Sequence, residues 1–137
     1  KHLVLNLNLS RSEQKLFLYE IKSKQQFEIS NQTANYSGQN FDKNDENFLY
    51  TTNYDSEFYY LMSYNLNNGD RSIVYKTNWD VAFSYLSKND SYRVIAVNED
   101  AQNKLTIKNM NDESDLSIVG TENMNINSVT FSDDEKI

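Results

Sequence analysis

The sequence contains no cysteine and no proline, and glycine occurs only at positions 38, 69 and 120. The absence of cysteine excludes disulfides, thiolate catalysis and cysteine-ligated zinc sites. Because proline is absent and glycine scarce, the turns must be built from Asn, Asp and Ser, which tolerate turn conformations and hydrogen-bond their own backbone. The chain has 20 Asn residues for this role.

Basic residues and long apolar runs are also scarce. Lys and Arg number 13 against 20 Asp and Glu, which gives a net charge of −7. An acidic chain without a basic cluster repels phosphate backbones, which argues against nucleic acid as a partner. The longest apolar run covers only residues 58–62, whereas a membrane-spanning helix needs about 20 apolar residues. The chain does not begin with Met and stops where an apolar strand begins, so we expect a fragment of a longer protein.

The sequence repeats itself with a period of 45 residues. Three polar turn segments match at this spacing: residues 41–45, 86–90 and 131–135. Apolar segments that begin at Leu16, Leu61 and Leu105 match as well, with the last displaced by one residue. Agreement at several separate points indicates an internal repeat, and a period in this range is typical of stacked repeat architectures.

Each repeat is predicted to hold four short β-strands. Its apolar segments are rich in Tyr, Phe, Ile, Val and Thr, are four to eight residues long, and show no sustained helical periodicity. Residues 67–70, Asn-Asn-Gly-Asp, predict a hairpin turn because Asn and Gly accept positive φ. Four strands in about 40–50 residues are typical of a propeller blade. The predicted fold class is all-β, a fragment of a β-propeller with about three four-stranded antiparallel blades.

The repeat also predicts where each blade begins. Residues 1–33 would hold the last three strands of one blade, residues 34–77 a second blade and residues 78–121 a third. Residues 122–137 would supply the first strand of a fourth blade. Since closed propellers have about four to eight blades, we expect exposed blade edges at both ends, which could allow self-association.

Several motifs resemble the propeller domain of bacterial prolyl oligopeptidase-like serine peptidases. Three of them occur in order: Asn78-Trp79-Asp80-Val81, Leu86-Ser87-Lys88-Asn89-Asp90 and Ala96-Val97-Asn98-Glu99-Asp100. Residues 50–58 and the hairpin at residues 64–69 add to the resemblance, and related turns occur in propellers of the Tol-Pal-associated type. The usual turn glycines are replaced by Asp90 and Ala101, so we expect a wider turn at Ala101.

The resemblance implies a non-catalytic role. In that family the propeller covers an α/β-hydrolase domain and restricts access to small peptides, so the implied partners are a hydrolase domain of the same parent chain and a peptide substrate. The family is often exported, which implies a periplasmic or secreted protein. This chain has no Gly-x-Ser-x-Gly elbow, and its only histidine is His2. We therefore predict no catalytic, cofactor-binding or metal-binding residues and no cofactor.

Two alternatives to this lid function remain. One is a stand-alone propeller that binds another protein, because the fold hosts many functions. The other is an enzyme that uses paired carboxylates, for which residues 112–113 and 133–135 are candidates. Both acidic segments lie in polar connectors, which favours solvated loops. Residues 42–46 resemble a calcium loop but lack its central Gly, which favours a structural turn.

Aromatic and basic side chains give the last candidates. A cluster of aromatics could form a platform for a peptide or a sugar, although packing between blades is favoured: Tyr54, Phe58, Tyr59, Tyr60 and Tyr64. Trp79 is interpreted as an anchor between blades. Arg71 and Arg93 could bind a substrate carboxylate, but surface charges are the simpler interpretation. His2 is expected to be an exposed terminal residue.

Overall fold

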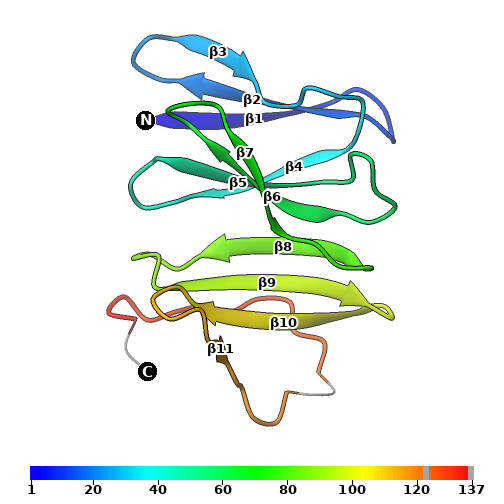
Figure 1. Cartoon of the computed structure of the whole chain (residues 1–137), viewed down its shortest axis with the longest axis vertical. Helices are drawn as coiled ribbons and strands as arrows, with labels where there is room; N and C mark the ends of the chain where they lie inside the picture. Colours follow the sequence, from blue (N-terminus) through cyan, green and yellow to red (C-terminus); the bar gives the residue numbers. More distant parts are fainter. Residues whose placement is uncertain (122–123, 136–137) are drawn as a thin grey trace.

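The chain folds into three antiparallel β-sheets stacked along its long axis (Figure 1). The computed structural model describes residues 1–121 and 124–135. The first sheet holds β1 (His2–Asn8), β2 (Gln14–Glu20) and β3 (Gln25–Glu28). The second holds β4 (Tyr36–Phe41), β5 (Asn47–Thr52), β6 (Tyr60–Asn65) and β7 (Arg71–Tyr75). The third holds β8 (Asp80–Leu86), β9 (Tyr92–Glu99), β10 (Gln102–Asn109) and β11 (Asp115–Leu116).

In each sheet neighbouring strands follow one another along the chain, as in a propeller blade. The predicted all-β fold class is therefore confirmed. Within the described residues no helix is long and apolar enough to cross a membrane. Residues 124–135 run beside the third sheet without forming a strand, and residues 122, 123, 136 and 137 lie outside the described residues. The first strand of a blade pairs with the second strand of the same blade, and the described residues contain no second strand for a fourth blade. The fourth blade therefore stays a prediction.

The 45-residue period is visible in the backbone dihedral angles. Residues with positive φ recur in three series at turns, with a spacing of 45 residues: Asp45, Asp90 and Glu135; Asp55 and Asp100; Lys24, Gly69 and Glu113. In the last series Glu113 is displaced by one residue from the expected position. Left-handed residues let the chain reverse tightly between antiparallel strands. Asp and Glu thus occupy positions where many proteins place glycine, which explains how three glycines suffice.

Two hydrophobic cores hold the blades together, one at each interface. The first core joins the first two sheets and includes Leu16, Leu18, Phe48 and Tyr50. The second core joins the second and third sheets: Leu49, Leu61, Val81, Ile95 and Val97. Consecutive residues of a strand point to opposite faces, so β5 sends Phe48 and Tyr50 into one core and Leu49 into the other. This explains why its sequence is apolar without alternation.

The first sheet leaves one apolar face open. Leu3, Leu5 and Leu7 on β1 are 49%, 45% and 48% exposed. Their counterparts 45 residues later are buried beneath the first sheet, at 1%, 2% and 2% exposure: Phe48, Tyr50 and Thr52. The open face is therefore the surface that another blade covers elsewhere in the chain. We name it the leucine face.

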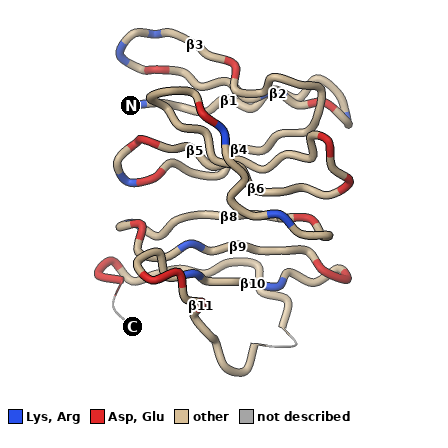
Figure 2. Tube along the Cα trace, viewed as in Figure 1, with Lys and Arg blue, Asp and Glu red and all other residues tan. Residues whose placement is uncertain are grey.

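The turn between β4 and β5 contacts the turn between β8 and β9, and that turn contacts Glu135. Figure 2 shows that most acidic residues lie in the turns at strand ends rather than within the strands. The backbone N–H of Lys43 donates to Asp90 Oδ2 (2.9 Å), and that of Asn89 donates to Glu135 Oε1 (2.6 Å). The Lys43 ammonium also donates to the Asn89 carbonyl (3.0 Å). These bonds fix the relative position of neighbouring blades at this end.

The contact at Glu135 should be sensitive to acid. Burial alone would raise the pKa of Glu135, but hydrogen bonds from Asn89, Ser91 and Ser87 outweigh it and hold the pKa below its ordinary value of 4.5. A carboxylate with a lowered folded-state pKa stabilises the fold above its unfolded pKa and loses this effect as the pH falls through the folded value. We expect amide hydrogen exchange in residues 124–135 to accelerate as the pH is lowered below about 4, after correction for intrinsic exchange rates.

The Glu135→Gln variant is the control, because its side chain does not titrate. Its corrected exchange rates in residues 124–135 should be fast already at pH 6 and change little with pH. Equal pH profiles for the variant and the wild type would contradict the assignment of this transition to Glu135.

The turn between β9 and β10 differs from the expectation. Glu99 pairs with Gln102, so the turn has two residues, Asp100 and Ala101, with φ of 51° and 61°. This is the geometry of a tight type I′ hairpin, and the prediction of a wider turn was wrong. Ala101 adopts the left-handed conformation instead, which costs a non-glycine residue about 1–2 kcal/mol.

Replacing Ala101 by Gly should therefore stabilise the chain. We expect a gain of about 0.5–1 kcal/mol, because relief of the left-handed strain is partly offset by the greater freedom of Gly in the unfolded state. Urea unfolding followed by circular dichroism measures the change. The matched variant Ala82→Gly, within β8, should lose about 0.5–1 kcal/mol. A loss of stability in both variants would show that Ala101 carries no strain.

Candidate binding site

A groove of about 380 Å³ runs along the edges of the three sheets. Its lining comes from all three blades: Asn6 from the first, Ser37, Thr51 and Tyr59 from the second, and Asp80 and Asn98 from the third. β1, β4 and β8, which contribute Asn6, Ser37 and Asp80, are the edge strands of their sheets. We name this feature the edge groove.

The repeat places equivalent residues along the edge groove. Three pairs of its lining residues are 45 positions apart: Asn6 and Thr51, Gln14 and Tyr59, and Ser37 and Ala82. Stacked blades present equivalent positions side by side, and in two of the three pairs both side chains are polar, so polar side chains from neighbouring blades line the groove together. A lining of this kind suits an extended ligand better than a compact one.

Several polar groups of the edge groove are free to bind. Within the described residues the side chains of Asn6, Ser37 and Asn98 have no hydrogen-bond partner. An amide side chain offers both donors and an acceptor, and a hydroxyl group offers one of each kind. These are the groups that complement the N–H and C=O of a polypeptide backbone.

Tyr59 and Asp80 form the rigid part of the groove. Asp80 Oδ1 accepts a hydrogen bond from the backbone N–H of Tyr59 (2.9 Å), and the backbone N–H of Val81 donates to the Tyr59 carbonyl (3.0 Å). These two bonds join the second blade to the start of β8. Burial raises the pKa of the Tyr59 hydroxyl, against a hydrogen bond from Asn35 that lowers it. Tyr59 is therefore a neutral hydroxyl at neutral pH.

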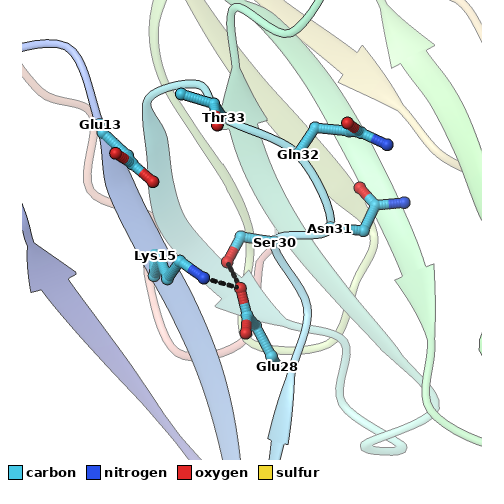
Figure 3. Close-up of a pocket in the computed structure, with 7 residues that line it drawn as sticks. All are labelled: Glu13, Lys15, Glu28, Ser30, Asn31, Gln32 and Thr33. Atoms are coloured by element: carbon cyan, nitrogen blue, oxygen red, sulfur yellow. Dashed lines mark hydrogen bonds and ion pairs between the residues drawn. The ribbon is translucent and has the colours of Figure 1, made fainter.

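A second groove, of about 460 Å³, lies beside the first sheet (Figure 3). Lys15 Nζ and Glu28 Oε1 form an ion pair at 2.8 Å, and Ser30 Oγ donates to the same oxygen at 3.0 Å. The hydrogen bond with Glu28 raises the pKa of Lys15, and the same bond lowers the pKa of Glu28. The central charges of this groove thus satisfy each other. Figure 3 shows Asn31 and Gln32 directed away from that pair, so the groove offers no convergent set of groups.

Two of the acidic candidates serve their own turns, whereas Glu135 is buried against the turn between β8 and β9, which corrects the solvated-loop interpretation for that residue. Asp42 accepts hydrogen bonds from the backbone N–H of Glu46 (2.7 Å) and of Asn47 (3.0 Å), which confirms the structural interpretation of that segment. Asp112 Oδ1 accepts from the backbone N–H and the hydroxyl of Ser114. The Ser114 hydroxyl lowers the pKa of Asp112. Asp133 forms an exposed ion pair with Lys88. Among the described residues no group of three His, Cys, Asp or Glu side chains is placed to hold a metal ion.

The five aromatic candidates do not share one surface. Tyr60 is buried, donates to the Tyr54 carbonyl (2.9 Å) and lies under the ammonium of Lys76. Tyr64 packs against the first core, with the Arg71 guanidinium 5.0 Å from its ring centre. Phe58 contacts Trp79, and Tyr59 lines the edge groove. The packing interpretation therefore holds for Tyr60 and Tyr64, whereas the platform does not form.

The structure also places Trp79 and His2, and it corrects the interpretation of His2. Trp79 is 37% exposed, and its ring centre lies 6.4 Å from that of Phe58 in the second blade, so it contacts the neighbouring blade from a partly exposed position. His2 is half-buried rather than exposed. Its ring is stacked with that of Phe41 at 6.4 Å, and its Nδ1 is buried without a hydrogen-bond partner. His2 starts β1, which places its side chain at the interface between the first two blades.

The two arginines have different surroundings. Arg71 donates to the Ile29 carbonyl (3.0 Å) and so joins β7 to the end of the first blade. Arg71 therefore links the first and second blades through a hydrogen bond and is not an isolated surface charge. Arg93 is partly buried between the second and third blades, which corrects the same interpretation for this residue.

The residues of the edge groove were not singled out in the sequence, apart from Tyr59 and Asp80. Asn6 and Ser37 are common polar residues without a motif, whereas Thr51 lies in residues 50–58 and Asn98 in the segment Ala96-Val97-Asn98-Glu99-Asp100. Among these four, only Asn6 and Thr51 stand at equivalent positions of the repeat, so the repeat was a signal for those two. A comparison of the repeats position by position would have found them.

Comparisons with known proteins support the fold alone. No protein-family model and no curated protein matches the sequence. The structure is similar to the crystal structure of TolB from Acinetobacter baumannii, with a TM-score of 0.65 and 13% sequence identity. The match covers 84% of this chain and 29% of that chain, so this chain spans less than a third of that protein's length. The chain thus has the fold of a β-propeller fragment.

Proposed function

We propose that this chain is a non-catalytic propeller module that binds an extended polypeptide segment along the edge groove. The observation that carries the proposal is the row of free amide and hydroxyl groups from three blades. A single nucleophile or a metal centre is not needed for this role. Backbone hydrogen bonds give affinity in such complexes, and alternate side chains of the ligand give specificity.

Selection from a random peptide library displayed on phage tests the proposal. The chain should enrich peptides that bind with micromolar affinity, and the double variant Ser37→Val/Asn98→Ala should weaken them at least tenfold. Asn111→Ala, in the exposed hairpin before β11, is the control and should leave the affinity unchanged. Failure to enrich any peptide, or equal binding by all three proteins, would overturn the proposal.

A second proposal assigns this module to a larger enzyme. The order of the motifs from Asn78 to Asp100 supports a lid that limits access to a hydrolase domain in the same parent chain, with a peptide as substrate. Mass-spectrometric sequencing of the parent protein past Ile137 decides it. A Gly-x-Ser-x-Gly elbow followed by an Asp and a His would support the lid. A parent without that elbow would leave the stand-alone binding module.

Self-association is proposed for the chain studied by itself. The leucine face is the repeat equivalent of surfaces that a neighbouring blade buries, so the third blade of a second copy is its proposed occupant. Sedimentation velocity over a range of concentrations should show dimers or longer species, and Leu5→Lys should shift them to monomers. A monomer at all concentrations would exclude this contact.

A further inference from the structure

A third groove, of about 320 Å³, lies between the outer strands of the second and third blades. β7 contributes Val74 and Tyr75 to its lining. The third blade contributes Arg93, Thr106, Lys108 and Asp115. It has a different lining from the edge groove, so its ligand is independent of the function proposed above.

Arg93 breaks the pattern of the repeat in this groove. Its counterpart 45 residues earlier is Phe48, which is 1% exposed and belongs to the first core. On the same face of β9, Ile95 and Val97 belong to the second core. A guanidinium therefore stands where the fold has a large apolar side chain. Burial of a charge costs free energy unless the charge is paired, so the position favours a role in binding over one in packing.

Among the described residues Arg93 forms no direct ion pair. Its Nε is buried without a hydrogen-bond partner. Asp90 acts on Arg93 through its charge alone, and burial lowers the pKa of the guanidinium. Arginine still remains protonated in proteins. The groove therefore holds a partly buried cation that Asp90 approaches without forming a direct ion pair.

Among the other charges of the groove, Lys108 lies close to Asp115, and the Glu113 side chain also belongs to the lining. Lys108 Nζ lies 3.8 Å from Asp115 Oδ1 and donates to the Glu113 carbonyl at 3.3 Å. Val74 and Met110 add apolar surface to the groove, whereas Ile95 lines it with only 3% of its surface exposed. The lining thus combines a guanidinium that forms no direct ion pair, the Lys108–Asp115 pair, the Glu113 carboxylate and apolar side chains.

We propose that this groove binds a carboxylate attached to an apolar group, with the carboxylate on Arg93. The planar guanidinium matches a carboxylate bidentately, which supplies orientation as well as affinity. The apolar part of the ligand would cover Val74, Ile95 and Met110. A free organic acid and the C-terminus of a peptide that ends in an apolar residue share this chemistry.

NMR titration tests the proposal with matched acids and amides. The probes are 4-phenylbutyrate and its amide, and the tripeptide acetyl-Ala-Ala-Phe as the free acid and as the amide. Each acid should bind at least tenfold more tightly than its amide and should shift the Arg93 Nε–Hε resonance. A tighter tripeptide acid would identify a peptide C-terminus as the ligand source, and a tighter phenylbutyrate would identify a small acid.

Variants at both arginines complete the test. Arg93→Met should keep the fold, because it replaces an unpaired buried charge by an apolar side chain of similar length. It should abolish the difference between acid and amide, whereas Arg93→Lys should keep part of it. Arg71→Met removes the other arginine between blades and should retain binding. Equal affinities for acid and amide in the wild type, or unchanged acid binding by Arg93→Met, would overturn the proposal.

Discussion

Phe48→Ala is expected to lower the free energy of unfolding by about 3–5 kcal/mol, the usual cost of removing a buried phenyl ring. Phe48 is 1% exposed and lies in the core between the first and second blades. Its ring centre is 4.9 Å from that of Phe41 and 6.3 Å from that of Tyr50. A domain of this size is stable by about 5–15 kcal/mol, so the variant should lose a large part of the total. Urea unfolding of both proteins measures the difference.

The repeat supplies a matched control for this variant. Leu3 stands 45 residues before Phe48 and occupies the equivalent position on β1, but it is 49% exposed. Leu3→Ala should cost less than about 1 kcal/mol at a protein concentration that keeps the chain monomeric, because the side chain is half-exposed already. Similar losses for both variants would mean that the leucine face is buried in solution and that the two positions are not distinguished by blade stacking.

The sheets could be predicted from the sequence because the same pattern of apolar segments and polar turns occurs in each blade. The strand sets that begin near Leu16, Leu61 and Leu105 occupy the same place in the three sheets, as β2, β6 and β10. The one-residue displacement of the last copy also appears in the backbone, where Glu113 rather than Ser114 takes the left-handed conformation of Gly69. Local patterns were sufficient here because each blade is an up-and-down meander of neighbouring strands.

The grooves could not be predicted in the same way. The edge groove brings Asn6 and Asn98 together from opposite ends of the stack, and no local motif carries that information. Arg93 was singled out, but its burial depends on β7, which belongs to another blade. The wrong expectation at Ala101 had a different cause. The hairpin register overrode the local cost of the left-handed conformation for a residue with a side chain.

Gly38 also shows how packing between blades constrains a residue. It lies inside β4 rather than in a turn, next to a shift in the register between β4 and β5. A Cβ atom at this position would lie 3.0 Å from Phe48 Cζ and 3.1 Å from Val4 Cγ1. Val4 belongs to the first blade and Phe48 to the second, so the absence of a side chain at Gly38 allows the two blades to approach each other. A methyl group there must displace atoms on both sides of the interface.

We therefore expect Gly38→Ala to lower the free energy of unfolding by about 1–3 kcal/mol, the usual cost of overpacking a core. Phe48→Leu removes the ring carbon that the new methyl group contacts. The double variant should lose less free energy of unfolding than the sum of the losses in the two single variants. The difference should be at least about 0.5 kcal/mol, as expected for residues in contact. Urea unfolding of the four proteins gives this coupling energy. Strict additivity would show that the cost at Gly38 arises from the backbone and not from the close approach of the two blades.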